Sequence, residues 1–103
     1  LEIFNLFYNE LEGTIPTEIG QMTALAELRL SLSYLTGTLP TELGKLTQLS
    51  GLRLERNSLT GIIPTEISEM SALSELALTE NSFTWTFPTE IGQLTNITSI
   101  WLH

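Results

Sequence analysis

The sequence repeats itself every 24 residues, and this period limits the fold more than any other feature of the chain. Apolar residues open successive periods at Leu1, Leu25, Leu49, Leu73 and Ile97. The triplet Pro-Thr-Glu recurs unchanged at 16–18, 40–42, 64–66 and 88–90. A fixed period of this length is typical of solenoids, in which each repeat packs only against its neighbours. We therefore expect a single domain with repeats at 1–24, 25–48, 49–72 and 73–96 and a partial fifth repeat at 97–103.

Each period carries signals for two kinds of secondary structure, and the third period shows both. Residues 49–54 alternate apolar and polar side chains around Arg53, as half-buried strands do. After a turn that contains Gly61, Pro64 suits the first turn of a short helix. The segment 65–72 has apolar residues three apart, enough for one 3₁₀ or α turn. A coil that returns its strand to the same side each time builds a parallel sheet, so we expect an α/β repeat solenoid.

One polar position recurs between the predicted strand and the turn. It is occupied by Asn9, Ser33, Asn57 and Asn81. An asparagine amide offers two donors and an acceptor, so it can satisfy backbone groups that leave the strand without ladder partners. We expect a ladder of such amides through the stack. The serine can donate only once, and we expect a water molecule or a slightly irregular turn beside it.

These residues resemble the plant-type leucine-rich repeat, whose pattern is L-x-x-L-x-L-x-x-N-x-L-x-G-x-I-P-x-x-L-G-x-L-x-x. Residues 49–72 follow it almost position for position, and the resemblance covers essentially the whole chain. It is the pattern of receptor-like kinase and receptor-like protein ectodomains, of polygalacturonase-inhibiting proteins and of similar algal proteins. Trp85 departs from it, because it stands where the pattern has glycine. Terminal caps are also missing, so we expect a fragment of a longer secreted or membrane-anchored protein.

The resemblance implies a right-handed superhelix with a concave parallel β-sheet. It also implies a second short strand near the L-x-G-x-I-P segment and 3₁₀ turns on the convex side. The expected role is recognition outside the cell, without enzymatic activity. We expect a receptor-like module in signal transduction; the alternative is a secreted inhibitor or cell-surface structural protein that binds a polysaccharide or another repetitive surface.

In this pattern the leucines face the core and the x positions, Ser31 and Ala77 among them, face the concave solvent side. The candidate ligand-binding residues on this face are Phe7, Tyr8, Arg29, Arg53, Arg56 and Trp101. Arginine and aromatic residues are enriched in binding hot spots. We predict that the face binds a protein or peptide, with the arginines on a carboxylate or another anionic group. The alternative is that Arg29 and Arg53 only pair with the glutamates at 27, 55 and 75.

Composition excludes several other functions. The chain has 12 acidic residues, all glutamate, against 4 Lys+Arg, and its net charge of −8 argues against nucleic-acid binding. Without cysteine there is no disulfide, thiolate metal site or cysteine nucleophile. No apolar run reaches the roughly 20 residues of a membrane helix. The single histidine, His103, ends the sequence, and we predict no catalytic residues, no metal and no cofactor.

Two further features are exposed in the predicted solenoid. Glutamate and threonine form columns at Glu18, Glu42, Glu66, Glu90, Thr17, Thr41, Thr65 and Thr89. We interpret them as a solvated edge; the alternative is a regular array that binds divalent cations, a polysaccharide or ice. Asn96-Ile97-Thr98 is the one N-x-S/T sequon, so Asn96 is a candidate for N-glycosylation.

Overall fold

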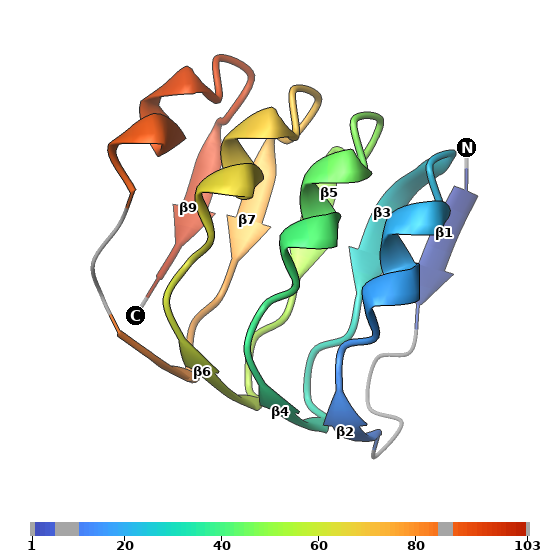
Figure 1. The fold of residues 1–103 in the computed structure, drawn as a ribbon, viewed down its shortest axis with the longest axis vertical. Coiled ribbons are helices and arrows are strands. Elements are labelled where there is room, and N and C mark those ends of the chain that lie inside the picture. Colours follow the sequence, from blue (N-terminus) through green and yellow to red (C-terminus); the bar gives the residue numbers. More distant parts are fainter. Residues whose placement is uncertain (1, 6–10, 85–87, 103) are drawn as a thin grey trace.

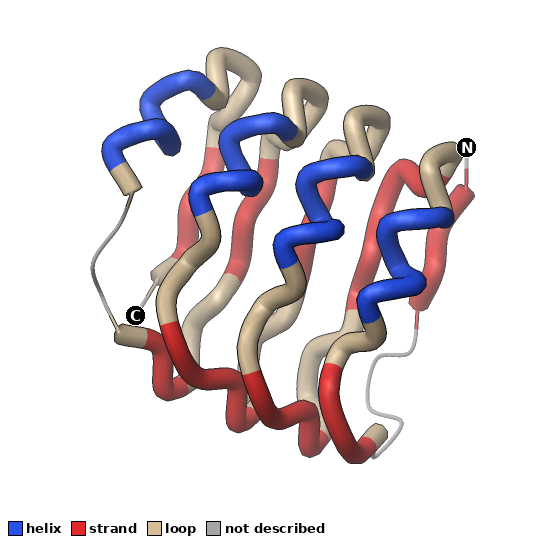
Figure 2. The backbone as a smooth tube through the Cα atoms, viewed as in Figure 1, coloured by secondary structure: helices blue, strands red, loops and turns tan. Residues whose placement is uncertain are grey.

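The chain forms a curved stack of similar coils in a computed structural model (Figure 1). The structure describes residues 2–5, 11–84 and 88–102. The predictions that concern Phe7, Tyr8, Asn9, Trp85 and His103 therefore lie outside the described residues. Each coil passes through a strand of a large sheet, a strand of a small sheet and a short helix on the outer side (Figure 2).

In the described part of the chain, the large sheet is parallel throughout and contains five strands. In spatial order these are β1 (Glu2–Asn5), β3 (Leu25–Arg29), β5 (Gly51–Arg53), β7 (Glu75–Ala77) and β9 (Ser99–Trp101). The alternation predicted at 49–54 is confirmed, but only Gly51–Arg53 is regular strand. Leu28, Leu52, Leu76 and Ile100 are register partners. Residues at the same position of successive repeats are thus neighbours across the sheet.

A second parallel sheet, with four strands among the described residues, forms one rim of the stack. Its strands are β2 (Glu12–Thr14), β4 (Tyr34–Gly37), β6 (Ser58–Gly61) and β8 (Ser82–Phe83). Gly61 ends β6 with a φ of +82°, a conformation that favours glycine. A Cβ atom there would lie 2.7 Å from Cγ2 of Thr38 in the coil before. This sheet is the second strand region that the family resemblance implies.

Short 3₁₀ helices cover the convex side. They are η1 (Thr17–Gln21), η2 (Thr41–Lys45), η3 (Thr65–Glu69) and η4 (Thr89–Gln93). Each follows a proline in extended conformation and carries a glutamate in its first turn, where the positive end of the helix favours negative charge. The turn predicted at 65–72 is confirmed as a 3₁₀ helix that ends earlier, at Glu69. Among the described residues no helix is both long and apolar enough to cross a bilayer.

The core lies between the large sheet and the helices and is built of stacked leucines. Leu28, Leu52 and Leu76 from the sheet are fully buried, as are Leu43 and Ile67 from the helices. Successive coils contribute the same apolar positions, so burial continues through the middle of the stack, whereas Ile100 in the last strand is 41% exposed. This is the leucine-rich-repeat solenoid that the sequence predicts.

Asparagine side chains close the turns after the large sheet. Asn57 accepts from the Leu35 amide at 3.1 Å and donates to the carbonyls of Leu30 at 2.9 Å and Leu54 at 3.0 Å. Asn81 makes the equivalent bonds one coil later. Ser33 is 6% exposed, and its hydroxyl has no partner among the described residues.

Candidate functional site

The concave face carries one row of side chains that crosses the whole large sheet. Register pairing joins Asn5 to Arg29, Arg29 to Arg53, Arg53 to Ala77, and Ala77 to Trp101. Neighbouring strands lie about 4.8 Å apart in such a sheet. Two of the predicted arginines and the predicted tryptophan therefore belong to one continuous surface. Trp101 is 57% exposed on it.

Every described arginine on this face is paired with a glutamate. Arg29 contacts Glu27 on its own strand. The Nη2 atom of Arg53 lies 3.0 Å from both carboxylate oxygens of Glu75 on the next strand. The pairing that the sequence left open as an alternative is therefore present at both positions.

Arg56 forms a third ion pair, which the sequence did not indicate. Its Nε donates to Glu80 at 3.0 Å. Arg56, Glu80 and Leu32 share one coil position, and all three have φ near +57°. None of them is glycine or asparagine, so their residue types gave no signal for this left-handed conformation. The shared conformation recurs at the same position of successive coils and brings Arg56 beside Glu80.

Glu55 follows β5, the middle strand of the large sheet, and differs from Glu27, Glu75 and Glu80 in its partners. Its carboxylate accepts a hydrogen bond from the Ser31 hydroxyl. It is in no ion pair among the described residues, whereas Glu27, Glu75 and Glu80 each have an arginine. The negative charge of Glu55 is thus left without an ion pair of its own among the described residues.

The pKa of Arg53 reflects the negative charge of the glutamates around it. Its hydrogen bond to Glu75 raises the pKa of the Arg53 guanidinium, and the charges of Glu75, Glu55 and Glu27 raise it further against the opposing effect of burial. Arginine is already charged at any ordinary pH. The raised pKa therefore indicates a negative local potential rather than a titration.

Two shallow hollows flank Arg53. One of about 250 Å³ is lined by Asn5, Arg29, Ser31, Arg53 and Glu55. The other, of about 190 Å³, is lined by Arg53, Glu55, Glu75, Ala77, Thr79 and Trp101. Ser31 and Ala77 are 4% and 3% exposed, so the prediction that both face solvent was wrong. The longer side chains beside them cover both residues.

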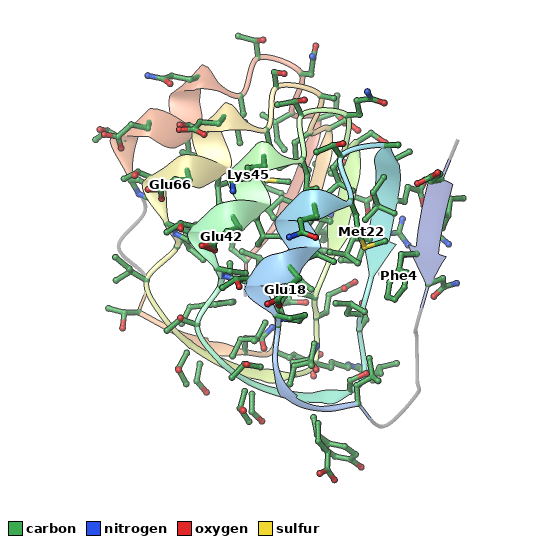
Figure 3. The ribbon with its side chains drawn as sticks, turned by 45° about the vertical axis from the view of Figure 1, so that its right-hand side comes forward. Phe4, Glu18, Met22, Glu42, Lys45 and Glu66 are labelled. Atoms are coloured by element: carbon green, nitrogen blue, oxygen red, sulfur yellow. The ribbon has the colours of Figure 1, made fainter. Side chains whose placement is uncertain are left out.

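The convex columns form a separate surface. Glu18, Glu42 and Glu66 follow one another along η1, η2 and η3, with Lys45 beside them (Figure 3). No group of three or more His, Cys, Asp or Glu residues in the described part of the chain could hold a metal ion. Asn96 lies in an exposed turn before β9, where its Nδ2 donates to the Ser71 carbonyl at 2.8 Å.

An apolar hollow of about 360 Å³ lies beside the first coil. Phe4 and Met22 border it, with Glu18 at its rim (Figure 3). Buried Leu30 and Leu35 form part of its lining. It contains few polar groups and is distinct from the concave row.

Comparison with known proteins agrees with this architecture. A sequence model described as Leucine Rich Repeat matches residues 1–22 and 48–70. The chain is built of leucine-rich repeats. A comparison with curated proteins found no match.

Several solved structures are similar to this leucine-rich repeat chain. The plant peptide hormone receptor RGFR1, in complex with RGF2, is 34% identical with a TM-score of 0.96 over 99% of this chain and 16% of the receptor chain. The Arabidopsis receptor kinase HAESA, in complex with the peptide hormone IDA and the co-receptor SERK1, is 39% identical with a TM-score of 0.92 over 100% of this chain and 17% of that chain. A plant ice-binding protein is 34% identical with a TM-score of 0.93 over 100% of this chain and 34% of that chain. The chain thus spans a minor part of each.

Proposed function

We propose that the chain is part of the extracellular ectodomain of a receptor-like protein and recognises a protein or peptide ligand on its concave face. Recognition, and not catalysis, is the role of the segment. Arg29, Arg53, Arg56 and Trp101 are the proposed contact residues among those described, and Asn96 is the proposed glycosylation site. Phe7 and Tyr8 remain predicted contacts.

The continuous concave row is the observation that carries this proposal. Asn5, Arg29, Arg53, Ala77 and Trp101 follow one another across five parallel strands. An extended peptide laid across the strands would meet side chains of every coil. Arg53 uses one nitrogen for Glu75, and a guanidinium has five N–H donors, so several remain for carbonyl or carboxylate oxygens of a ligand. The similarity to RGFR1 and HAESA, each solved with a peptide hormone, also supports the proposal.

A pair of glycine substitutions tests where a ligand binds. Random linear peptides displayed on phage are selected on the chain, and their affinities are then measured for two variants. Gly51→Trp places a large ring in the middle of the concave face, where a Cβ atom lies at an ordinary 3.6 Å from Glu27. Gly92→Trp is the matched control on the convex side, where a Cβ atom has nothing within 4 Å.

We expect Gly51→Trp to abolish binding of the selected peptides and Gly92→Trp to leave it unchanged. Equal binding by both variants would contradict the proposal, because the ligand would then lie elsewhere. Circular dichroism of both variants confirms that the fold is retained.

Ice is the second candidate ligand, and it would occupy another surface. The similarity to a plant ice-binding protein favours it. The small sheet exposes hydroxyl side chains at Thr36, Ser58, Thr60 and Ser82. Thermal hysteresis of the chain that disappears in Thr60→Lys would favour this candidate over peptide recognition. Its absence, together with peptide binding sensitive to Gly51→Trp, would exclude it.

A further inference from the structure

We propose that the hollow between Arg53 and Trp101 binds a cationic side chain, the guanidinium or ammonium group of a basic residue in the peptide ligand. This inference rests on the proposed function, because the hollow lies on the concave face. It assigns the ligand a charge opposite to the one that the arginines alone suggest. Four observations carry it: the charges around the hollow, its aromatic wall, its size and the potential at Arg53.

The charges around this hollow leave a negative surplus. Arg53 is the one cation among the described residues of its lining, and Glu55 and Glu75 both line it. The Nη2 atom of Arg53 is paired with Glu75 at 3.0 Å. The Glu55 carboxylate accepts from the neutral Ser31 hydroxyl and has no ion pair among the described residues. A cation entering the hollow would give Glu55 the charged partner that it lacks.

Trp101 supplies an aromatic surface on the same hollow. It lies at the end of the concave row, two strands from Arg53, and is 57% exposed. Tryptophan attracts cations more strongly than other aromatic side chains, because its π-face carries negative charge density. A hollow whose lining includes two carboxylates and an indole is complementary to a guanidinium or ammonium group. An anionic group would be repelled by both.

The size of the hollow suits one side chain. Its volume is about 190 Å³, whereas pockets for small molecules hold about 300–1,000 Å³. A single residue of a longer ligand is therefore the appropriate occupant. The rest of the peptide would continue along the row toward Arg29 and Asn5.

The electrostatic environment of Arg53 agrees with this assignment. The carboxylates of Glu75, Glu55 and Glu27 all raise the pKa of its guanidinium. The same field that stabilises this fixed cation acts on a mobile one nearby. The net charge of −8 on the whole chain would also attract a basic partner over a longer range.

Nuclear magnetic resonance titrations with three small probes test the inference. The probes are the Nα-acetyl amides of arginine, of citrulline and of aspartate, which carry a cation, its neutral isostere and an anion. The readouts are the indole N–H of Trp101 and the backbone amides of Ala77 and Thr79. We expect the arginine probe to bind saturably and the citrulline probe about tenfold more weakly, because the cation–π and charge interactions are lost.

Three variants and one matched control locate the effect. Glu55→Gln keeps an acceptor for Ser31 but removes the charge, and we expect it to weaken the arginine probe about threefold. Trp101→Ala should remove the aromatic contribution, and Trp101→Phe should restore part of it. Glu42→Gln, which changes the net charge equally on the convex side, is the matched control and should change nothing.

The possible failures are distinguishable. Stronger binding of the aspartate probe, equal effects of Glu55→Gln and Glu42→Gln, or no shift with any probe would overturn the cationic subsite. If Gly51→Trp still abolished binding of the selected peptides, the proposed function would remain supported without the cationic subsite. Failure of Gly51→Trp to affect those peptides would instead contradict the proposed function itself.

Discussion

Asn57 and Ser33 occupy the same position of successive coils, but they differ in their side-chain hydrogen bonds to the backbone. The Asn57 amide accepts from Leu35 and donates to carbonyls of its own coil and of the coil before. Ser33 is buried, and its hydroxyl has no partner among the described residues. A buried polar group without a hydrogen bond costs about 1–3 kcal/mol. The second coil is therefore a weak point that a single residue creates.

Ser33→Asn should stabilise the chain. By analogy with Asn57, which accepts from the Leu35 amide of the coil before, the new side chain would accept from the Leu11 amide and donate to the carbonyls of Leu30 and Ser31. We expect the free energy of unfolding, measured by urea denaturation, to rise by about 1 kcal/mol. Ser58→Asn, at an exposed position of β6, is the control and should change it little. A loss of stability in Ser33→Asn, or equal changes in both variants, would show that the ladder does not extend through the second coil.

At the scale of elements, the convex helices approach one another closely because two of them contain glycine at the contact. A Cβ atom on Gly44 would lie 2.6 Å from the Glu66 carbonyl oxygen and 3.0 Å from the Glu66 Cβ atom. Gly20 faces Glu42 in the same way, at 2.8 and 2.9 Å. Gly92 has the same place in η4, and a Cβ atom there would meet nothing within 4 Å. Glycine at this position thus permits the close approach of η1 to η2 and of η2 to η3.

Gly44→Ala should destabilise the chain, because the backbone of η3 must shift to admit the methyl group. Overpacking of this kind costs about 1–3 kcal/mol. Gly92→Ala is the matched variant and should be neutral or slightly stabilising, because alanine orders a helix more readily than glycine. Urea denaturation of both variants measures the difference. Equal stabilities would mean that the helices are spaced by something other than this contact.

The order of elements could be predicted from the sequence because the period fixes it. Residues 49–54 and Pro64 recur in equivalent form in other periods, so strand, turn and helix follow in each coil. The ends of the elements were less predictable, since β5 keeps only Gly51–Arg53 and η3 ends at Glu69. Hydrogen bonds to neighbouring coils decide those ends, and a single period does not contain that information.

The position of the candidate site could be predicted from the sequence, but the pairing of its charged side chains could not. The repeat pattern placed Arg29 and Arg53 side by side, and the structure has them as register partners. The contact between Arg56 and Glu80 depends on a left-handed backbone that neither residue type signals. Side-chain pairing of this kind is decided by local geometry, which periodicity does not specify. The sequence therefore indicated a surface, and the structure supplied its electrostatic pattern.

At the scale of the whole molecule, net charge works against compactness. The chain contains twelve glutamates but only four Lys and Arg residues. The column of Glu18, Glu42 and Glu66 places like charges on adjacent helices. Neighbouring exposed charges repel by about 1 kcal/mol in water before screening. The ion pairs of the concave face are partly or largely exposed, and such pairs contribute about 0–1 kcal/mol each. Repulsion should outweigh them.

Moderate salt should therefore stabilise the chain. Raising ionic strength from about 0.01 M to 0.15 M shortens the screening length from about 30 Å to 8 Å. We expect the free energy of unfolding, measured in urea at both sodium chloride concentrations, to rise by about 1 kcal/mol. Glu42→Gln should reduce this gain. A fall in stability with added salt would show that the concave ion pairs dominate instead.

The central claim is that equal positions of successive coils become neighbours on one concave sheet, since the recognition surface depends on it. The chain lacks cysteine, so a pair of engineered cysteines can test the claim directly. Neighbouring parallel strands lie about 4.8 Å apart, within the Cα separation of about 4.4–6.8 Å that a disulfide spans. In the variant with Arg29→Cys and Arg53→Cys we expect mild oxidation to give an intramolecular disulfide, seen by mass spectrometry as the loss of two hydrogens. The pair Arg29→Cys and Glu42→Cys, on opposite sides, should stay reduced. Free thiols at 29 and 53 under conditions that oxidise accessible pairs would contradict the register and the recognition surface built on it.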